Sequence, residues 1–160
     1  MQNHDVTEFD RLVDAGKLFF LQTRTLNSTA NRYLLIRTGA KKLNLLVSIE
    51  TEMGCQVNLI EAPATVTGVS ALVGRNFNRN FPDDGLLSKT YSITGYTGGT
   101  NISPNMSGFG SSLGNATSGI TSDRVKYKLK PNTDYVYEVD PDGSTAMDTK
   151  ARSIGWEDEE

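Results

Sequence analysis

The sequence predicts an all-β fold, an antiparallel β-sandwich of jelly-roll type with a long Gly/Ser-rich loop and an N-terminal arm or short helix. Three observations support this prediction. Short segments rich in β-branched and aromatic residues recur along the chain, several of them alternate apolar and polar residues, and clusters of Gly, Pro, Asn, Asp and Ser separate them. About eight such segments in a chain of one-domain length are typical of a sandwich or barrel.

The N-terminal segment, residues 1–16, is predicted to be an arm that precedes a sandwich domain formed by residues 17–160. Phe9 and Val13 stand at roughly helical spacing in this segment, and Gly16 is a common helix stop. The segment is therefore either one short helix or an extended arm that becomes ordered on a partner. Phe9 and Val13 are candidates for that contact.

The next segments are strand candidates. Residues 17–24 and 32–38 are rich in β-forming residues and are joined by a polar connection. Residues 43–52 alternate apolar and polar side chains, as a half-buried strand does, and residues 55–62 repeat the pattern after a Met-Gly turn. We expect 43–62 to form an antiparallel hairpin.

The second half of the chain continues in the same way. Residues 64–75, with a bulge at Gly68, and residues 88–96 are further strand candidates. Residues 123–130 alternate apolar residues with lysine, and the chain then turns at Pro131-Asn132 and returns as a second hairpin. A last strand is predicted within 148–159.

Residues 95–122 interrupt this pattern. They contain seven glycines and many Ser, Thr and Asn residues, without a strong period. A loop of this length in a compact domain is usually functional or disordered. It is either a mobile insertion or a contact loop whose apolar anchors need a surface to pack against. The anchor candidates are Ile102, Met106, Phe109 and Leu113.

Composition limits the chemistry. The net charge of −3 disfavours general binding of nucleic acid. His4 is the only histidine and Cys55 the only cysteine, so histidine-based catalysis and thiolate metal sites have little to build on. The N-terminus lacks the pattern of a signal peptide, and the apolar runs are too short to span a bilayer. We expect no cofactor, no nucleic-acid partner and no membrane partner.

The acidic residues offer no strong catalytic pair. Asp83 and Asp84 follow a proline and precede a glycine, which indicates a turn rather than an acid/base pair. Asp140 and Asp142 match only the first half of a calcium loop, because the closing glutamate is missing. The sequence therefore favours a protein that is not an enzyme.

The stretch RNFNRNF at residues 75–81 is the most distinctive polar segment. Arginines interleaved with aromatic residues can hold nucleic acid, but this is the only such cluster in an acidic chain. With Phe77 and Phe81 turned inward, the polar side chains would lie at the rim of a sheet. There they would form a structural polar network or contact a partner subunit. The candidates are Arg75, Asn76, Asn78, Arg79 and Asn80.

The order of motifs resembles that of the head decoration, or capsid cement, proteins of tailed bacteriophages. In those proteins a strand ending in E-x-P precedes an N-x-NR element, and an LKPxTxY motif lies near the C-terminus. The matching residues here are Glu61, Pro63, Asn76, Asn78 and Arg79, followed by Leu129, Lys130, Pro131, Thr133 and Tyr135. The resemblance covers about residues 30–158.

This resemblance implies a structural virion protein that stabilises the outer surface of a phage capsid by binding major capsid protein subunits. It also implies self-association as a homotrimer and synthesis in the host cytoplasm before assembly onto the virion. The alternative is a carbohydrate- or receptor-binding β-domain of a phage tail or fibre. Exposed aromatic residues near amides and carboxylates would favour that alternative, but the sequence indicates no such cluster.

Overall fold

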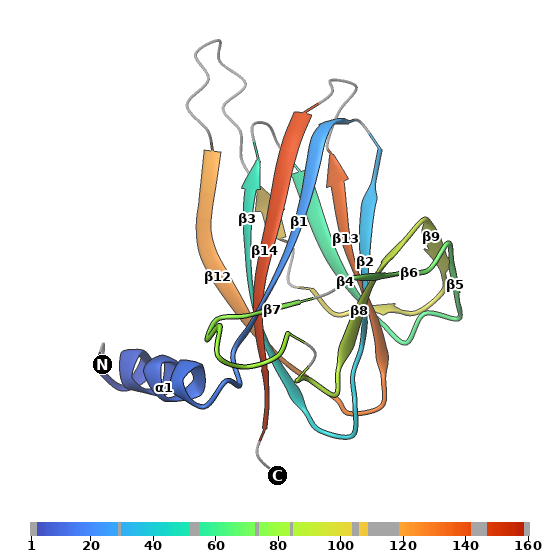
Figure 1. Cartoon of the computed structure of the whole chain (residues 1–160). Helices are drawn as coiled ribbons and strands as arrows, with labels where there is room; N and C mark the ends of the chain where they lie inside the picture. The colour runs from blue at the N-terminus through green and yellow to red at the C-terminus, as the bar shows by residue number, and fades with distance from the viewer. Residues whose placement is uncertain are drawn as a thin grey trace.

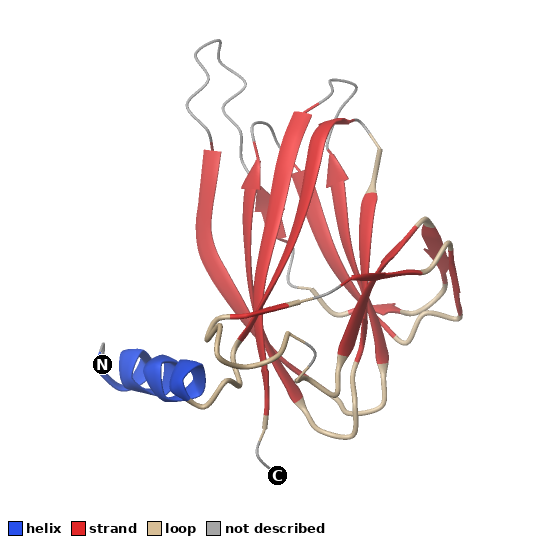
Figure 2. Cartoon of the chain, in the orientation of Figure 1, coloured by secondary structure: helices blue, strands red, loops and turns tan. Residues whose placement is uncertain are grey.

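Two antiparallel sheets face each other and form the body of the protein, with a single helix in the described part near the N-terminus (Figure 2). The computed structural model describes residues 3–28, 30–51, 55–72, 74–83, 85–103, 106–108, 119–141 and 147–158. The predicted all-β antiparallel sandwich is confirmed. The jelly-roll type stays a prediction.

The first sheet has five strands in the order β12–β3–β14–β1–β7 (Figure 1). Their bounds are β1 Phe19–Ser28, β3 Leu43–Thr51, β7 Arg75–Asn76, β12 Gly119–Leu129 and β14 Met147–Glu157. The last strand predicted from the sequence is therefore present. It lies in the middle of this sheet, because β14 pairs with both β1 and β3.

The second sheet has seven strands in the order β10–β4–β13–β2–β8–β6, with β11 also paired to β4. Their bounds are β2 Arg32–Arg37, β4 Cys55–Glu61, β6 Ser70–Leu72, β8 Lys89–Ile93, β10 Thr100–Asn101, β11 Met106–Gly108 and β13 Asp134–Pro141. A third sheet pairs only β5 (Thr65–Thr67) with β9 (Gly95–Thr97).

The predicted hairpins are wrong, although their strands exist. β3 belongs to the first sheet and β4 to the second, and β12 and β13 are divided in the same way. Alternation of apolar residues marks a strand with one buried face, but it does not specify the neighbouring strand. In both pairs the chain crosses from one sheet to the other, so the two strands meet face to face across the core instead of pairing edge to edge.

Two other predictions need correction. Segment 64–75 is not one bulged strand but three short ones, β5, β6 and β7, with Gly68 at a φ of 63°. Segment 95–122 is not one irregular loop, because it contains β9, β10, β11 and the start of β12. Short strands of Gly, Thr and Asn residues carry little apolar alternation, so the sequence pattern missed them.

The main core lies between the two sheets. It is formed by Leu34, Ile36, Leu43, Leu45, Val47, Leu59, Leu129, Tyr135, Tyr137 and Val139. A second apolar cluster lies on the outer face of the seven-stranded sheet, where Leu35 and Val136 point away from the main core and pack with Val66 of β5 and Tyr96 of β9. The small β5–β9 sheet therefore covers that face.

Tyr135 connects the two sheets at the turn after β12. Its side chain is fully buried, and its hydroxyl accepts a hydrogen bond from the backbone N–H of Lys130, 3.0 Å away. The same hydroxyl donates to Glu61 Oε2 at 3.2 Å, and Lys130 Nζ pairs with Glu61 Oε1 at 2.6 Å. A tyrosine whose hydroxyl reaches back to the backbone a few residues upstream is known from Greek-key sandwiches. The LKPNTDY stretch is thus a corner between sheets.

Helix α1 (Asn3–Asp14) covers the lower end of the outer face of the five-stranded sheet (Figure 1). Gly16 ends it in a left-handed conformation, with φ at 66°. Gly16 N–H donates to Val13 O and Lys17 N–H donates to Leu12 O, the pair of bonds that defines a Schellman cap. The helical alternative for the N-terminal segment is therefore the one that the structure shows.

Candidate contact surface

Asn76 holds the segment 75–83 against the turn that follows α1. Its side-chain Nδ2 donates to Gly16 O at 2.8 Å and to Pro82 O at 3.3 Å, and its Oδ1 accepts from Asn78 N–H at 2.9 Å. Only 2% of Asn76 is exposed. The prediction that Asn76 contacts a partner therefore needs correction. Asn76 belongs to a structural polar network, which was the alternative prediction for this segment.

Asn78 and Asn80 continue this turn. Asn78 Oδ1 accepts from Asn80 N–H at 3.1 Å, and Asn78 Nδ2 lies 3.5 Å from Asp14 O at the end of α1. The backbone N–H of Phe81 donates to Asn78 O at 3.0 Å. Asn80 itself is exposed. The asparagines thus shape a turn and attach it to the helix, which asparagine does well because its amide replaces backbone partners.

The arginines and phenylalanines of the same segment face solvent. Arg75 and Arg79 have side chains that are 70% and 64% exposed, and Phe77 and Phe81 are 42% and 41% exposed. We call these four residues the Arg–Phe ridge. The expectation that the phenylalanines turn inward is wrong, because the buried carbonyls at this corner need the amide of Asn76 and a phenyl ring could not satisfy them.

The ridge is fixed from below by its own aromatic contacts. The ring of Phe77 meets that of Phe20 edge to face, with centroids 5.8 Å apart. The ring of Phe81 lies directly over Gly16, where a Cβ would come within 2.2 Å of the ring. Gly16 is therefore required twice, for its positive φ and for the space that Phe81 occupies.

Asp83 is the acidic partner of both ridge arginines. Its Oδ1 accepts from the backbone N–H of Asn76 at 2.8 Å and from Arg79 Nη1 at 2.6 Å, and its Oδ2 lies 3.5 Å from Arg75 Nη1. The Asn76 N–H, followed by Arg79, lowers the pKa of Asp83 below its usual range. Two guanidinium groups thus share one carboxylate, so the described ridge carries a net positive charge.

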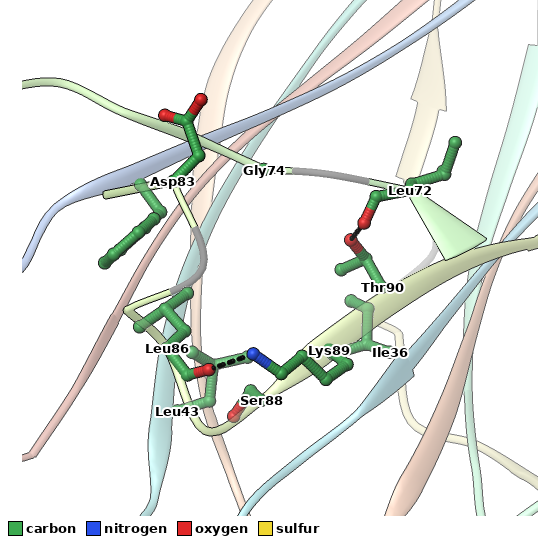
Figure 3. A pocket seen from close by; sticks show the side chains of 10 residues that line it. Ile36, Leu43, Leu72, Gly74, Asp83, Leu86, Ser88, Lys89 and Thr90 are labelled. Carbon is green, nitrogen blue, oxygen red and sulfur yellow. Dashed lines mark hydrogen bonds between the residues drawn. The ribbon is translucent and has the colours of Figure 1, made fainter. Parts of the chain in front are cut away.

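A cavity of about 150 Å³ opens beside the ridge, between β7 and the strands β6 and β8 (Figure 3). Phe19, Ile36 and Leu43 of the main core line it, together with Leu72 and Leu86 near the surface. Asp83 also lines it, but its carboxylate points away from the other lining side chains (Figure 3) and pairs with the ridge arginines. A second cavity of about 300 Å³ adjoins the first, because Phe19 and Leu86 line both.

The two apolar candidates on α1 pack inside the protein. The ring of Phe9 meets that of Trp156 with centroids 5.6 Å apart, and Val13 packs with Leu12, Leu18 and Trp156 in the same cluster. Both are partly buried. The face of α1 that carries Phe9 and Val13 packs against the five-stranded sheet. Their role in contacting a partner stays a prediction.

The candidates in segment 95–122 are only partly described. Ile102 is 37% exposed, and its backbone N–H donates to Leu59 O at 2.8 Å. Met106 begins β11 and pairs in register with Val57. Phe109 and Leu113 lie outside the described residues. Ile102 follows β10, which lies at the opposite edge of the seven-stranded sheet from β6.

A polar aromatic cluster that the sequence analysis missed lies on the outer face of the seven-stranded sheet. Glu138 accepts hydrogen bonds from Asn31 Nδ2 at 3.0 Å, Asn58 Nδ2 at 3.1 Å and Tyr96 Oη at 3.1 Å. The rings of Tyr96 and Tyr33 meet edge to face at 5.6 Å. Burial, followed by the Glu138 carboxylate, raises the pKa of Tyr96 to about 12. Glu138 pairs in register with both Tyr33 and Asn58, a pairing that the sequence pattern does not contain.

Among the described residues, no group of three or more His, Cys, Asp or Glu side chains could hold a metal ion. None of these residues belongs to a helix with the length and hydrophobicity needed to cross a membrane. Comparison with family models, with curated proteins and with solved structures finds no match for this chain. The geometry of the site and the motif order therefore carry the functional argument.

Proposed function

We propose that this chain is a structural virion protein that decorates and stabilises the outer surface of a phage capsid by binding major capsid protein subunits. The observation that carries the proposal is the Arg–Phe ridge, two exposed arginines alternating with two exposed phenylalanines on a rigid base. Arginine and aromatic residues are enriched where protein surfaces bind each other, and they supply much of the binding free energy.

The rigid base supports this role. The hydrogen bonds of Asn76 and the packing of Phe81 on Gly16 fix the ridge before any partner arrives. A fixed surface loses less conformational entropy on binding than a mobile loop does. Since a capsid repeats the same subunit many times, a modest contact per copy is enough to stabilise the whole lattice. Any partner that binds only the assembled state shifts the equilibrium toward it.

The order of strands supports a jelly roll. Every connection between the long strands β1, β2, β3, β4, β12, β13 and β14 crosses from one sheet to the other, and the passage from β4 to β12 contains shorter strands of all three sheets. Two Greek keys folded on each other produce such an order, and viral capsid and lectin domains both use it. This is an analogy of fold, and the function still depends on the ridge.

The proposal is tested with purified protein and expanded phage heads that lack their decoration protein. We expect the protein to sediment with expanded heads and to raise the temperature at which they release DNA. Unexpanded shells are the control, and we expect little binding to them because the lattice contact is absent. A protein that stays in the supernatant with both kinds of particle would contradict the proposal.

The cluster around Glu138 favours a second candidate function, carbohydrate or receptor binding in a phage tail or fibre. Tyrosine rings beside a carboxylate and amides match the hydroxyl groups and apolar faces of sugars. Binding to a glycan array that is lost in Glu138→Ala, without binding to heads, would favour this candidate over capsid decoration. Glu138→Ala needs a folding check by circular dichroism, because Glu138 accepts a hydrogen bond from Tyr96 of β9.

A further inference from the structure

The cavity beside the Arg–Phe ridge is open to the surface but has a floor of core residues. Phe19, Ile36 and Leu43 line it, and each of them is 2% exposed or less. Most of its wall is apolar, and the polar groups Ser88, Lys89 and Thr90 stand with Asp83 among its lining residues. Such a composition is typical of a site that binds an apolar group, with a few polar groups at the rim that give specificity.

The volume limits what the cavity can hold. An engineered cavity of about 150 Å³ lined by Leu, Ile and Phe stays dry and binds benzene. The cavity here has a volume of about 150 Å³ and a comparable apolar lining. It therefore suits one group the size of a benzene ring or a leucine side chain.

The rim of the cavity is held in place by hydrogen bonds. Lys89 Nζ donates to Leu86 O at 2.7 Å, a bond that Figure 3 shows along one side of the opening. Glu157 Oε1 accepts from the backbone N–H and the hydroxyl of Ser88, at 2.6 and 2.7 Å. Glu157 Oε2 accepts from Leu87 N–H at 3.1 Å. The opening thus exists without a rearrangement of the segment 85–89.

The surroundings of the cavity indicate a protein partner. Asp83 lines the cavity and also binds both arginines of the ridge, so the two features form one continuous surface. Leu72 and Leu87, which are 38% and 55% exposed, add apolar area around the two cavities. A free small molecule in the cavity would leave this apolar area exposed to solvent and would not contact the positively charged ridge. A protein surface would cover both.

We propose that the cavity takes one apolar side chain of the partner surface, from a segment that also carries a carboxylate for the ridge arginines. This inference rests on the proposed function, because it names the part of the capsid surface that the ridge would recognise. A buried anchor side chain in a preformed pocket is a common source of binding free energy at protein interfaces. A neighbouring carboxylate would pair with Arg75 or Arg79, which in the described part of the chain share the single carboxylate of Asp83.

The inference is tested by filling the cavity. In Leu86→Phe the larger ring would occupy the space of the anchor, and we expect binding to expanded heads to weaken by roughly tenfold or more. Val69→Phe is the matched control, since Val69 is 44% exposed and lines neither cavity. We expect that variant to bind within about threefold of wild type. Leu72→Phe fills the cavity from the surface side and is the alternative filling variant if Leu86→Phe does not fold.

A second measurement needs no heads. We expect benzene, added to the isotope-labelled protein, to shift the amide signals of Phe19, Ile36 and Leu72, and these shifts to vanish in a folded filling variant. Absence of such shifts in wild type would overturn the inference. A filling variant that binds heads as wild type does would also overturn it while leaving the proposed function intact. If wild-type protein binds no heads, the proposed function fails and this occupant fails with it.

Discussion

Asn76 shows how a single polar side chain can decide which residues face a partner. Buried inside the corner between α1 and β1, it satisfies the carbonyls of Gly16 and Pro82. Its neighbours in sequence, Arg75 and Phe77, must then point the other way. The exposed ridge is therefore a consequence of where the amide is needed.

We expect Asn76→Ala to lower the free energy of unfolding by about 2 kcal/mol, because it leaves buried carbonyl groups without a donor. Urea unfolding followed by circular dichroism measures the change. Asn80→Ala is the matched control, since Asn80 is exposed, and its effect should stay within about 0.5 kcal/mol. Equal stability of the two variants would show that the Asn76 network does not hold the corner.

Stability should also fall in acid. The pKa values of Glu61, Asp83 and Asp158 are all lowered in the folded protein, first of all by hydrogen bonds from Lys130, from the Asn76 N–H and from Lys128, respectively. A lowered pKa means that the folded state binds protons less readily than the unfolded chain. This stabilisation is complete above the ordinary values of 3.8 to 4.5 and is lost as the pH falls through the lowered ones.

Urea unfolding between pH 7 and pH 3 measures this dependence. We expect a midpoint that is nearly constant down to about pH 5 and then decreases. In Asp83→Asn the decrease should be smaller, because one of the three carboxylates no longer titrates. A midpoint that rises below pH 4 would contradict the assigned pairs.

At the residue scale, the sequence showed that segment 75–81 was distinctive but not which side chains were outside. The alternation of Arg, Asn and Phe is plain in the sequence. The direction depends on the end of α1, whose carbonyls lie 60 or more residues away along the chain. No local pattern contains that information. The sequence therefore favoured Phe77 and Phe81 as the buried residues, whereas Asn76 is buried.

At the scale of elements, α1 belongs to the folded body. Its Leu12 is buried with Leu18 and Trp156, and Phe9, Val13, Leu46 and Ile154 pack around them. Lys126 Nζ lies 5.2 Å from the centre of the Trp156 ring. Trp156 is thus enclosed between the helix and the sheet, and it is the only tryptophan in the chain.

Fluorescence of Trp156 can therefore report on the helix. We expect Phe9→Ala to lower the unfolding free energy by about 1–2 kcal/mol and to shift the tryptophan emission to longer wavelength, because the ring loses a cover that excludes water. Glu8→Ala, at an exposed neighbouring position, should leave both properties unchanged. Unchanged emission in Phe9→Ala would mean that α1 does not pack on Trp156 in solution.

The sequence predicted where most strands lie but not how they pair. Apolar alternation in 43–52 and 123–130 revealed β3 and β12, since each has one buried face. It also suggested hairpins, which the structure replaces by crossings between sheets. Pairing is set by contacts far apart in sequence, such as that of β14 with β1 and β3, and single-sequence periodicity does not record them.

At the scale of the whole molecule, the segment between β4 and β10 gives the sandwich its distinctive surfaces. β6 and β8 extend one sheet, β7 extends the other, and β5 with β9 covers the outer face of the seven-stranded sheet. The ridge and the cavity both lie on this segment or beside it. Two exposed arginines and the exposed phenylalanines Phe77 and Phe81 thus lie on a part that the two main sheets hold in place.

Binding of a charge-reversed ridge to expanded heads tests the central claim most directly. We expect Arg75→Glu/Arg79→Glu to lower the amount of protein that sediments with the heads by about tenfold or more, because the ridge would repel a carboxylate-bearing surface. Lys126→Glu/Lys128→Glu makes the same change in net charge at exposed positions of β12, at the edge of the five-stranded sheet opposite β7, and should bind as wild type does. Equal binding by the two folded variants would contradict the claim that the ridge is the surface by which this protein adheres to a capsid.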